Sequence, residues 1–202
     1  MAIKIFDSVL KKNPRCIRSL YGKALIYDKL SEIEEDNAKL IKSIKFYKKL
    51  FQTELLLDKD NLNLQLGAGK RLINRLQFLG ENKEAIEHLK LFIDLFPNEI
   101  QFKNELGVTY LLTNNVNLAR ITFKNVLNKS PNNPFALVHY GFILKQIDRK
   151  VTESIDYLKR GIDSLDKSIM DGKFFYHLGD ALQRVNKSEE VKKIPLLSTF
   201  NV

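Results

Sequence analysis

The chain has 202 residues, of which 44% are hydrophobic, and its 33 basic and 24 acidic residues give a formal net charge of +9. That hydrophobic content excludes a disordered tail and is enough for a sizeable core, in one domain or in an elongated array of repeats. The basic residues are spread along the chain without a Lys/Arg-rich recognition helix, so a solvated lysine-rich surface explains the charge better than nucleic-acid or anionic-membrane binding.

The first residues resemble one half of a two-helix repeat. Residues 1–14 contain no apolar run long enough for a signal peptide or a membrane span, so we expect no membrane segment in this chain. Ala2, Phe6 and Val9 instead recur at helical intervals before Pro14, as in the second helix of such a unit. We expect a half repeat that either serves as an imperfect cap or follows further structure upstream.

The next segment departs from a regular repeat. A helix is expected from Ile17 to about Leu30, with Gly22 as the residue of closest helix contact. Ser31 and Glu34 have the spacing of a capping box, which predicts that a new helix begins at Ser31. We therefore expect a long insertion near residues 31–63, ending in a weakly patterned connection.

Three kinds of landmark then recur every 34 residues. They are a proline, an alanine and a glycine, found as the pairs Pro97 and Pro131, Ala85 and Ala119, and Gly107 and Gly141. A helix-turn-helix unit of this length is typical of tetratricopeptide repeats. Small residues at Gly107 and Ala119 let the two helices approach closely, and Phe123 and Val126 are expected to fill the space toward the next unit. The pattern predicts an all-α, tetratricopeptide-like, right-handed α-solenoid.

The last part of the chain continues the pattern and then loses it. Asn133 can cap a helix whose first residue is Pro134, and a further first helix opens after Asp171. Pro195 interrupts the partner of that helix. We predict a repeat domain over residues 1–191, with about four to five helix pairs and a half-built last repeat, followed by a divergent tail over residues 192–202.

No catalytic or metal-binding motif is present. The stretch GAGK at 67–70 resembles a phosphate loop, but the required Ser/Thr position holds Arg71. The three histidines, His88, His139 and His177, lack metal-ligand spacing. Cys16 is the only cysteine, so no intrachain disulfide can form. We predict no catalytic residue, no metal site and no cofactor in this chain.

A binding groove is the remaining prediction. In such arrays the first helices of successive units line the concave face. Asn, Lys and Arg side chains there can hold peptide groups and carboxylates, the alternative being a solvated polar face without a ligand. The predicted groove residues are Lys70, Arg71, Asn74, Gln77, Asn104, Glu105, Val108, His139, Phe142, Lys145, Tyr176, Asp180 and Arg184.

Several strings also resemble one family. They are RLINRLQFLG (71–80), LFPNEIQFKNELGVTYLL (95–112), FALVHYGFILK (135–145), ESIDYLKRGI (153–162) and DGKFFYHLGDALQRV (171–185). They are similar to the tetratricopeptide region of aspartyl/asparaginyl β-hydroxylase (peptide-aspartate β-dioxygenase), and the likeness extends from Ile3 to about Glu190. In that family the repeats help to form the substrate cleft of a C-terminal Fe(II)/2-oxoglutarate dioxygenase domain. That domain hydroxylates Asp or Asn in EGF-like domains, and the family is membrane-anchored in the endoplasmic reticulum lumen.

The end of the chain departs from the family. After Glu190 the sequence IPLLSTFNV ends the chain where the family continues toward its catalytic domain, and none of the three histidines matches the iron ligands. We therefore predict a non-catalytic, EGF-like-domain-binding region of a fragment, a truncated isoform or an incomplete gene model. The alternative is a free-standing adaptor for a protein or peptide partner, which would be cytoplasmic.

Overall fold

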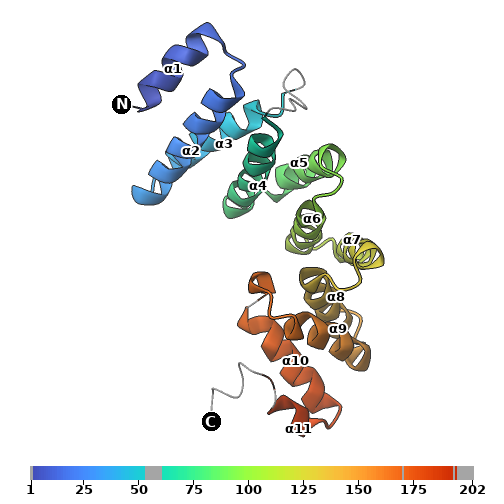
Figure 1. The fold of residues 1–202 in the computed structure, drawn as a ribbon. Coiled ribbons are helices and arrows are strands. Elements are labelled where there is room, and N and C mark those ends of the chain that lie inside the picture. Colours follow the sequence, from blue (N-terminus) through green and yellow to red (C-terminus); the bar gives the residue numbers. More distant parts are fainter. Residues whose placement is uncertain (1, 53–60, 170, 193, 195–202) are drawn as a thin grey trace. The chain divides into compact units, whose positions relative to one another are not determined.

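A computed structural model describes residues 2–52, 61–169, 171–192 and 194. These residues form α-helices joined by turns, one short 3-10 helix and no strand (Figure 1). The helices are α1 (Ala2–Lys12), α2 (Ile17–Ile33), α3 (Asn37–Lys49), α4 (Leu62–Phe78), α5 (Asn82–Leu95), α6 (Ile100–Leu112), α7 (Val116–Lys129), α8 (Pro134–Gln146), α9 (Val151–Asp163), η3 (Lys167–Ile169), α10 (Gly172–Arg184) and α11 (Ser188–Val191). The predicted all-α class is confirmed for the described part of the chain.

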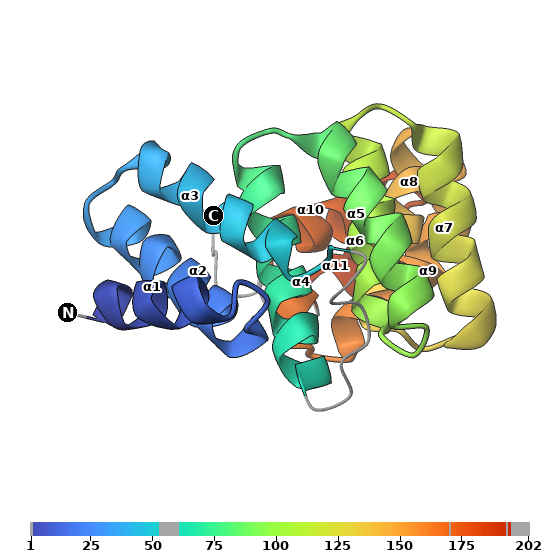
Figure 2. The same cartoon turned by 90° about the horizontal axis from the view of Figure 1, so that it is seen from above.

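The helices after α1 follow one another as helix-turn-helix pairs. Residues within the turns adopt positive φ, at 50° for Glu35, 75° for Gly80 and 59° for Asn114. The backbone N–H of the residue after each of them bonds a carbonyl in the preceding helix, for example Asn115 N to Tyr110 O at 2.7 Å. This left-handed C-terminal cap ends one helix and reverses the chain within a few residues. The paired helices therefore lie side by side, as α2 and α3 do in Figure 2.

The chain forms two compact units, Met1–Phe102 and Lys103–Val202. The core of the first unit is built from the facing sides of α2 to α5, where Tyr47, Leu72 and Phe92 are fully buried. The core of the second unit contains Phe123 and a cluster of α8, α9 and α10 residues, to which Ile194 also belongs.

The predicted close contacts of the glycines are confirmed. A Cβ on Gly107 of α6 would lie 2.5 Å from Cζ of Phe123 on α7, and a Cβ on Gly22 of α2 would lie 2.5 Å from Cζ of Phe6 on α1. A real Cβ does not approach a ring carbon so closely, so each phenylalanine occupies space that only glycine leaves free.

The caps confirm one sequence prediction and correct another. Asn133 caps α8 by accepting a hydrogen bond from Ala136 N at 2.9 Å, and Pro134 stands in the first turn. The prediction that a helix begins at Ser31 is wrong. Ser31 Oγ donates to the carbonyl oxygen of Asp28 at 2.7 Å within α2, whereas Asp36 caps α3 and accepts from Ala38 N at 2.7 Å. The hydroxyl is satisfied inside the helix, so α2 continues past it.

The predicted insertion and tail are only partly described. The stretch 31–63 contains the α2–α3 turn, α3 and the segment between α3 and α4, of which residues 53–60 lie outside the described residues. Most of the predicted tail, including Pro195, lies outside them as well. Within the described part, α11 is a helix of four residues.

Candidate binding surface

All the predicted groove residues lie on α4, α6, α8 and α10, the first helices of four successive pairs. Those on α4 belong to the first unit, and those on the other three helices belong to the second. Their surroundings differ widely, because some are exposed, some are held in ion pairs and others are buried.

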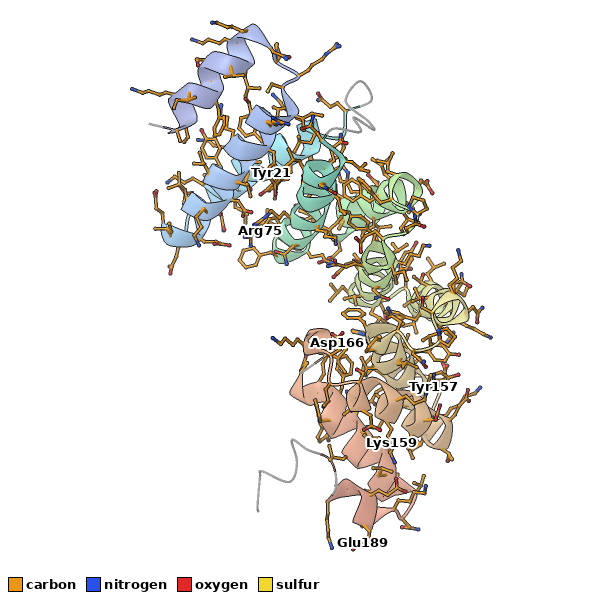
Figure 3. The ribbon with its side chains drawn as sticks, in the orientation of Figure 1. Tyr21, Arg75, Tyr157, Lys159, Asp166 and Glu189 are labelled. Carbon is orange, nitrogen blue, oxygen red and sulfur yellow. The ribbon has the colours of Figure 1, made fainter. Side chains whose placement is uncertain are left out.

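In the first unit the polar surface is organised around Asp28 of α2, which is 1% exposed. Its Oδ1 accepts from Arg75 Nε at 2.6 Å, and its Oδ2 accepts from Tyr47 Oη at 3.0 Å and from Arg71 Nη1 at 3.3 Å. Arg75 also bonds Glu32, and it lies on the side of α4 that faces α2 (Figure 3). A carboxylate can be buried here because three donors replace its water.

The phenol in this cluster is fixed as a donor. Burial raises the pKa of Tyr47 well above its ordinary value, and the Asp28 carboxylate raises it further. Tyr47 is therefore protonated at neutral pH and donates its hydrogen to Asp28. The groove prediction includes Arg71 but omits Asp28, Glu32 and Arg75. A signal was present, since Asp28 interrupts an apolar stretch and Arg71 and Arg75 are four residues apart on one helix face.

Parts of this surface remain open to solvent. The side chain of Arg71 is 49% exposed, and Asn74, one turn further along α4, is exposed as well. Lys70 Nζ lies 3.0 Å from Glu99 Oε2, and Gln77 is half-buried. Arg71 and Asn74 are thus the predicted residues of this unit that are most accessible to a partner.

In the second unit the structure brings four of the predicted residues together. Lys145 of α8 has a side chain that is 1% exposed, and its Nζ lies 2.6 Å from Asp180 Oδ2 on α10. Arg184 Nε lies 3.0 Å from the same oxygen, and the ring of Tyr176 is centred 5.7 Å from Lys145 Nζ. We call Lys145, Tyr176, Asp180 and Arg184 the α10 patch. The hydrogen bond from Lys145 lowers the pKa of Asp180 below its usual range, so this carboxylate is ionised at neutral pH.

His177 lies beside the α10 patch and was not among the predicted groove residues. Its Nδ1 is 3.1 Å from Gln146 Nε2 and 3.3 Å from Lys145 Nζ, and both of these groups are donors. Burial lowers the pKa of His177, and the neighbouring Lys145 charge lowers it further. The ring is therefore neutral at pH 7, with Nδ1 as an acceptor.

Besides Lys145, two further predicted groove residues of this unit are buried. His139 stacks on Phe123 and Phe135 with ring centroids 5.2 and 4.2 Å apart, and its Nδ1 lies 2.8 Å from the Phe135 carbonyl oxygen. Burial lowers the pKa of His139 to about 4. Asn104 Nδ2 donates to Asn133 Oδ1 at 3.2 Å, so it supports the cap of α8. At both positions the nearest groups are therefore protein groups of the interior.

The other predicted residues of this unit are half-buried. Glu105 and Val108 lie on α6, and the Phe142 ring on α8 is centred 5.0 Å from that of His177. Among the described residues, no group of three or more His, Cys, Asp or Glu side chains is placed to hold a metal ion. None of the described helices is both long enough and apolar enough to cross a bilayer.

Comparisons with known proteins address both the sequence and the fold. No family model matches the chain. The chain is 41% identical over 192 residues to aspartyl/asparaginyl beta-hydroxylase of Mus musculus and 41% identical over 191 residues to that of Homo sapiens. Each alignment covers 95% of this chain but only 25% and 24% of the relative, so the chain spans about a quarter of these relatives' length.

Solved structures with low sequence identity share the fold. MamA from Desulfovibrio magneticus RS-1 matches with a TM-score of 0.58 and 18% identity, covering 85% of this chain and 90% of that one. YrrB, described as a TPR protein with an unusual peptide-binding site, matches with a TM-score of 0.58 and 17% identity, over 94% of this chain and 88% of that one. Pseudomonas aeruginosa pilF matches with a TM-score of 0.68 and 14% identity, over 95% of this chain and 79% of that one. The predicted tetratricopeptide fold is thereby confirmed.

Proposed function

The chain is related along nearly its whole length to a region of the aspartyl/asparaginyl β-hydroxylases, and from this relation we propose that it is a non-catalytic protein-binding region of such a protein. In this proposal its repeats bind the substrate, an EGF-like domain, for an Fe(II)/2-oxoglutarate dioxygenase domain located elsewhere. Fe(II) and 2-oxoglutarate would be bound by that domain. The same relation favours the endoplasmic reticulum lumen as the location.

Within this chain, the α10 patch is the surface that supports the proposal. Tyr176 is 63% exposed, and the side chain of Arg184 is 60% exposed, while Lys145 and Asp180 beneath them are joined at 2.6 Å. Tyrosine and arginine are among the residue types most enriched at the centres of protein interfaces. The ion pair holds the α10 side chains in place before a partner arrives, and such preorganisation lowers the entropic cost of binding.

The partner groups that this patch can recognise follow from its chemistry. The Arg184 guanidinium can donate to a carboxylate or to the side-chain carbonyl of an asparagine. Tyr176 offers a flat apolar ring with a hydroxyl at its edge. Aspartyl and asparaginyl side chains on a small disulfide-bonded domain fit these groups, and this match supports an EGF-like domain as the partner.

The experiment measures binding of an isolated EGF-like domain to the 202-residue chain by biolayer interferometry. Tyr176→Ser and Arg184→Gln should each weaken binding about fivefold or more, as expected for exposed interface residues. Lys124→Gln, at an exposed position on α7, removes one positive charge outside the patch and should leave binding unchanged. No binding of either the oxidised or the reduced domain would contradict the proposal.

A free-standing adaptor is the second candidate, and the likeness to solved tetratricopeptide proteins such as YrrB favours it. It predicts that unrelated peptides bind the patch at least as well as an EGF-like domain does. Under either candidate the isolated chain should show no 2-oxoglutarate turnover, and detectable turnover would contradict both.

A further inference from the structure

A second surface, in the first unit, also has the composition of a binding site. A pocket of about 430 Å³ opens between α1, the α1–α2 turn, α2 and α3. Leu10, Pro14 and Phe46 supply its apolar walls, and Lys11, Lys23 and Lys49 supply its positive charges. We call these six residues the basic pocket. Its volume is within the range of sites that accept one or two side chains or a small ligand.

Phe46 is the aromatic centre of the basic pocket. Lys23 Nζ and Lys49 Nζ lie 4.5 and 5.5 Å from the centroid of its ring. The ring also stacks on Tyr27, with centroids 5.8 Å apart and planes 1° from parallel. The stack fixes the ring, and the two ammonium groups are held beside it by cation–π attraction.

The charges of the pocket are only partly neutralised. Lys23 forms an ion pair with Asp7, the one carboxylate that lines the pocket. Within the described part of the chain, no carboxylate pairs with Lys11 or Lys49. Helix α3 contains five lysines and no acidic residue, and although Lys39 and Lys48 pair with carboxylates outside the helix, the other three add positive charge. Two ammonium groups beside an apolar wall are therefore available to an anionic partner.

We propose that the basic pocket binds an acidic peptide segment in which a carboxylate stands next to a large apolar side chain. The apolar side chain would lie against Leu10, Pro14 and Phe46, and the carboxylates would pair with Lys11 and Lys49. This surface shares no residue with the α10 patch, so the inference goes beyond the proposed function and does not depend on it.

The pocket favours a peptide over the other polyanions. A nucleic-acid backbone presents a continuous series of phosphates, whereas here Asp7 interrupts the lysines and would repel one of them. An anionic membrane would need apolar side chains that project outward, but those of this pocket form its concave wall. A short acidic segment with one apolar side chain matches both the shape and the charge.

The test measures fluorescence anisotropy of a labelled peptide in which glutamate, phenylalanine and glutamate are flanked by glycine and serine. The 202-residue chain should bind it with saturation below about 1 mM, and added salt should weaken binding. Replacing both glutamates by glutamine, or the phenylalanine by serine, should each abolish most of the binding. Equal binding of either altered peptide, or no binding at all, would overturn the proposal.

Protein variants locate the site. The double variant Lys11→Gln/Lys49→Gln should weaken binding about tenfold, since two partly exposed ion pairs are lost. The matched control Lys83→Gln/Lys90→Gln makes the same charge change at exposed positions of α5 and should bind normally. Equal weakening by the control would show that only net charge matters and would overturn the proposal. Tighter, lysine-dependent binding of an oligothymidine or of phosphatidylserine vesicles would assign the pocket to those partners instead.

Discussion

Gly107 and Phe123 are in direct contact, and the ring of Phe123 occupies the space where a Cβ on Gly107 would lie, 2.5 Å from Cζ. The ring is fully buried between α6 and α7 and has little room to move. Gly107→Ala should therefore destabilise the protein by about 1–2 kcal/mol, because overpacking outweighs the roughly 1 kcal/mol that alanine gains in helix propensity. Urea denaturation followed by circular dichroism measures the change.

Gly172→Ala is the matched control for Gly107→Ala. Gly172 also lies in a helix, but a Cβ there would meet no atom within 4 Å. Its substitution should leave the free energy of unfolding unchanged or raise it slightly. In the Gly107→Ala background, Phe123→Leu should cost less than it does in the wild type, because the smaller side chain relieves the contact. Additive effects of the two substitutions would argue against the contact as the cause.

Substitution of Asp28 should also destabilise the protein. Asp28→Asn keeps the shape of the side chain but removes the charge that Arg71 and Arg75 face at 3.3 and 2.6 Å. We expect a loss of about 2 kcal/mol in the free energy of unfolding, since Arg75 is largely buried and keeps only Glu32 as an ionic partner. Glu32→Gln alters an exposed partner of the same arginine and should leave the denaturation midpoint nearly unchanged. Similar losses for both variants would contradict this account.

The ion pair between Lys145 and Asp180 should respond unequally to the loss of either partner. Asp180→Asn leaves the buried Lys145 ammonium without its carboxylate and should cost about 2 kcal/mol. Lys145→Met replaces the buried charge by an apolar chain of similar length, and Asp180 keeps Arg184 as a partner, so the loss should be smaller. Thermal denaturation of the two variants and of the double variant measures the difference. A larger loss of stability for Lys145→Met than for Asp180→Asn would contradict the claim that the unpaired, buried lysine charge causes the destabilisation.

The sequence predicted the local and periodic features of this fold because they depend on residues close together in the chain. The 34-residue spacing located Gly107 and Ala119, and the Asn133 cap depends only on the residues that follow it. The ion pairs of Asp28 with Arg71 and Arg75 join residues 43 and 47 positions apart, on α2 and α4. No periodic pattern specifies such a distance, so the cluster could not be assembled from sequence.

The groove prediction rests on helix periodicity, which does not determine the exposure of every side chain. Periodicity assigns a residue to a face of a helix, whereas the neighbouring helix decides whether that face is covered. Tyr176 and Arg184 are exposed, but Lys145 on the preceding first helix is covered by α10. Asn104 and Lys145 are therefore unsuitable as probes of binding, because their substitution would alter stability as well.

His139 should make the stability of the protein depend on pH. Burial lowers its pKa to about 4, against an ordinary value of 6.5 in the unfolded chain. Between these two values the unfolded state binds a proton that the folded state does not. The folded state is therefore most stable above about pH 6.5. As the pH falls toward 4, the free energy of unfolding decreases by roughly 3 kcal/mol in total. The pKa of Asp180 is also lowered, so its contribution to stability is lost only at pH values below about 4.

The measurement is the free energy of unfolding by urea at several pH values between 7.5 and 4.5. His139→Gln keeps a polar side chain that can bond the Phe135 carbonyl but does not titrate, so it should flatten the decline. His177→Gln removes a histidine that is less buried and whose pKa is also lowered, and it should flatten the decline less. An NMR titration of the His139 ring gives the folded pKa directly. A value near 6.5 would contradict the burial of this ring, because burial among aromatic rings favours the neutral imidazole more than the Asp171 charge favours the protonated form.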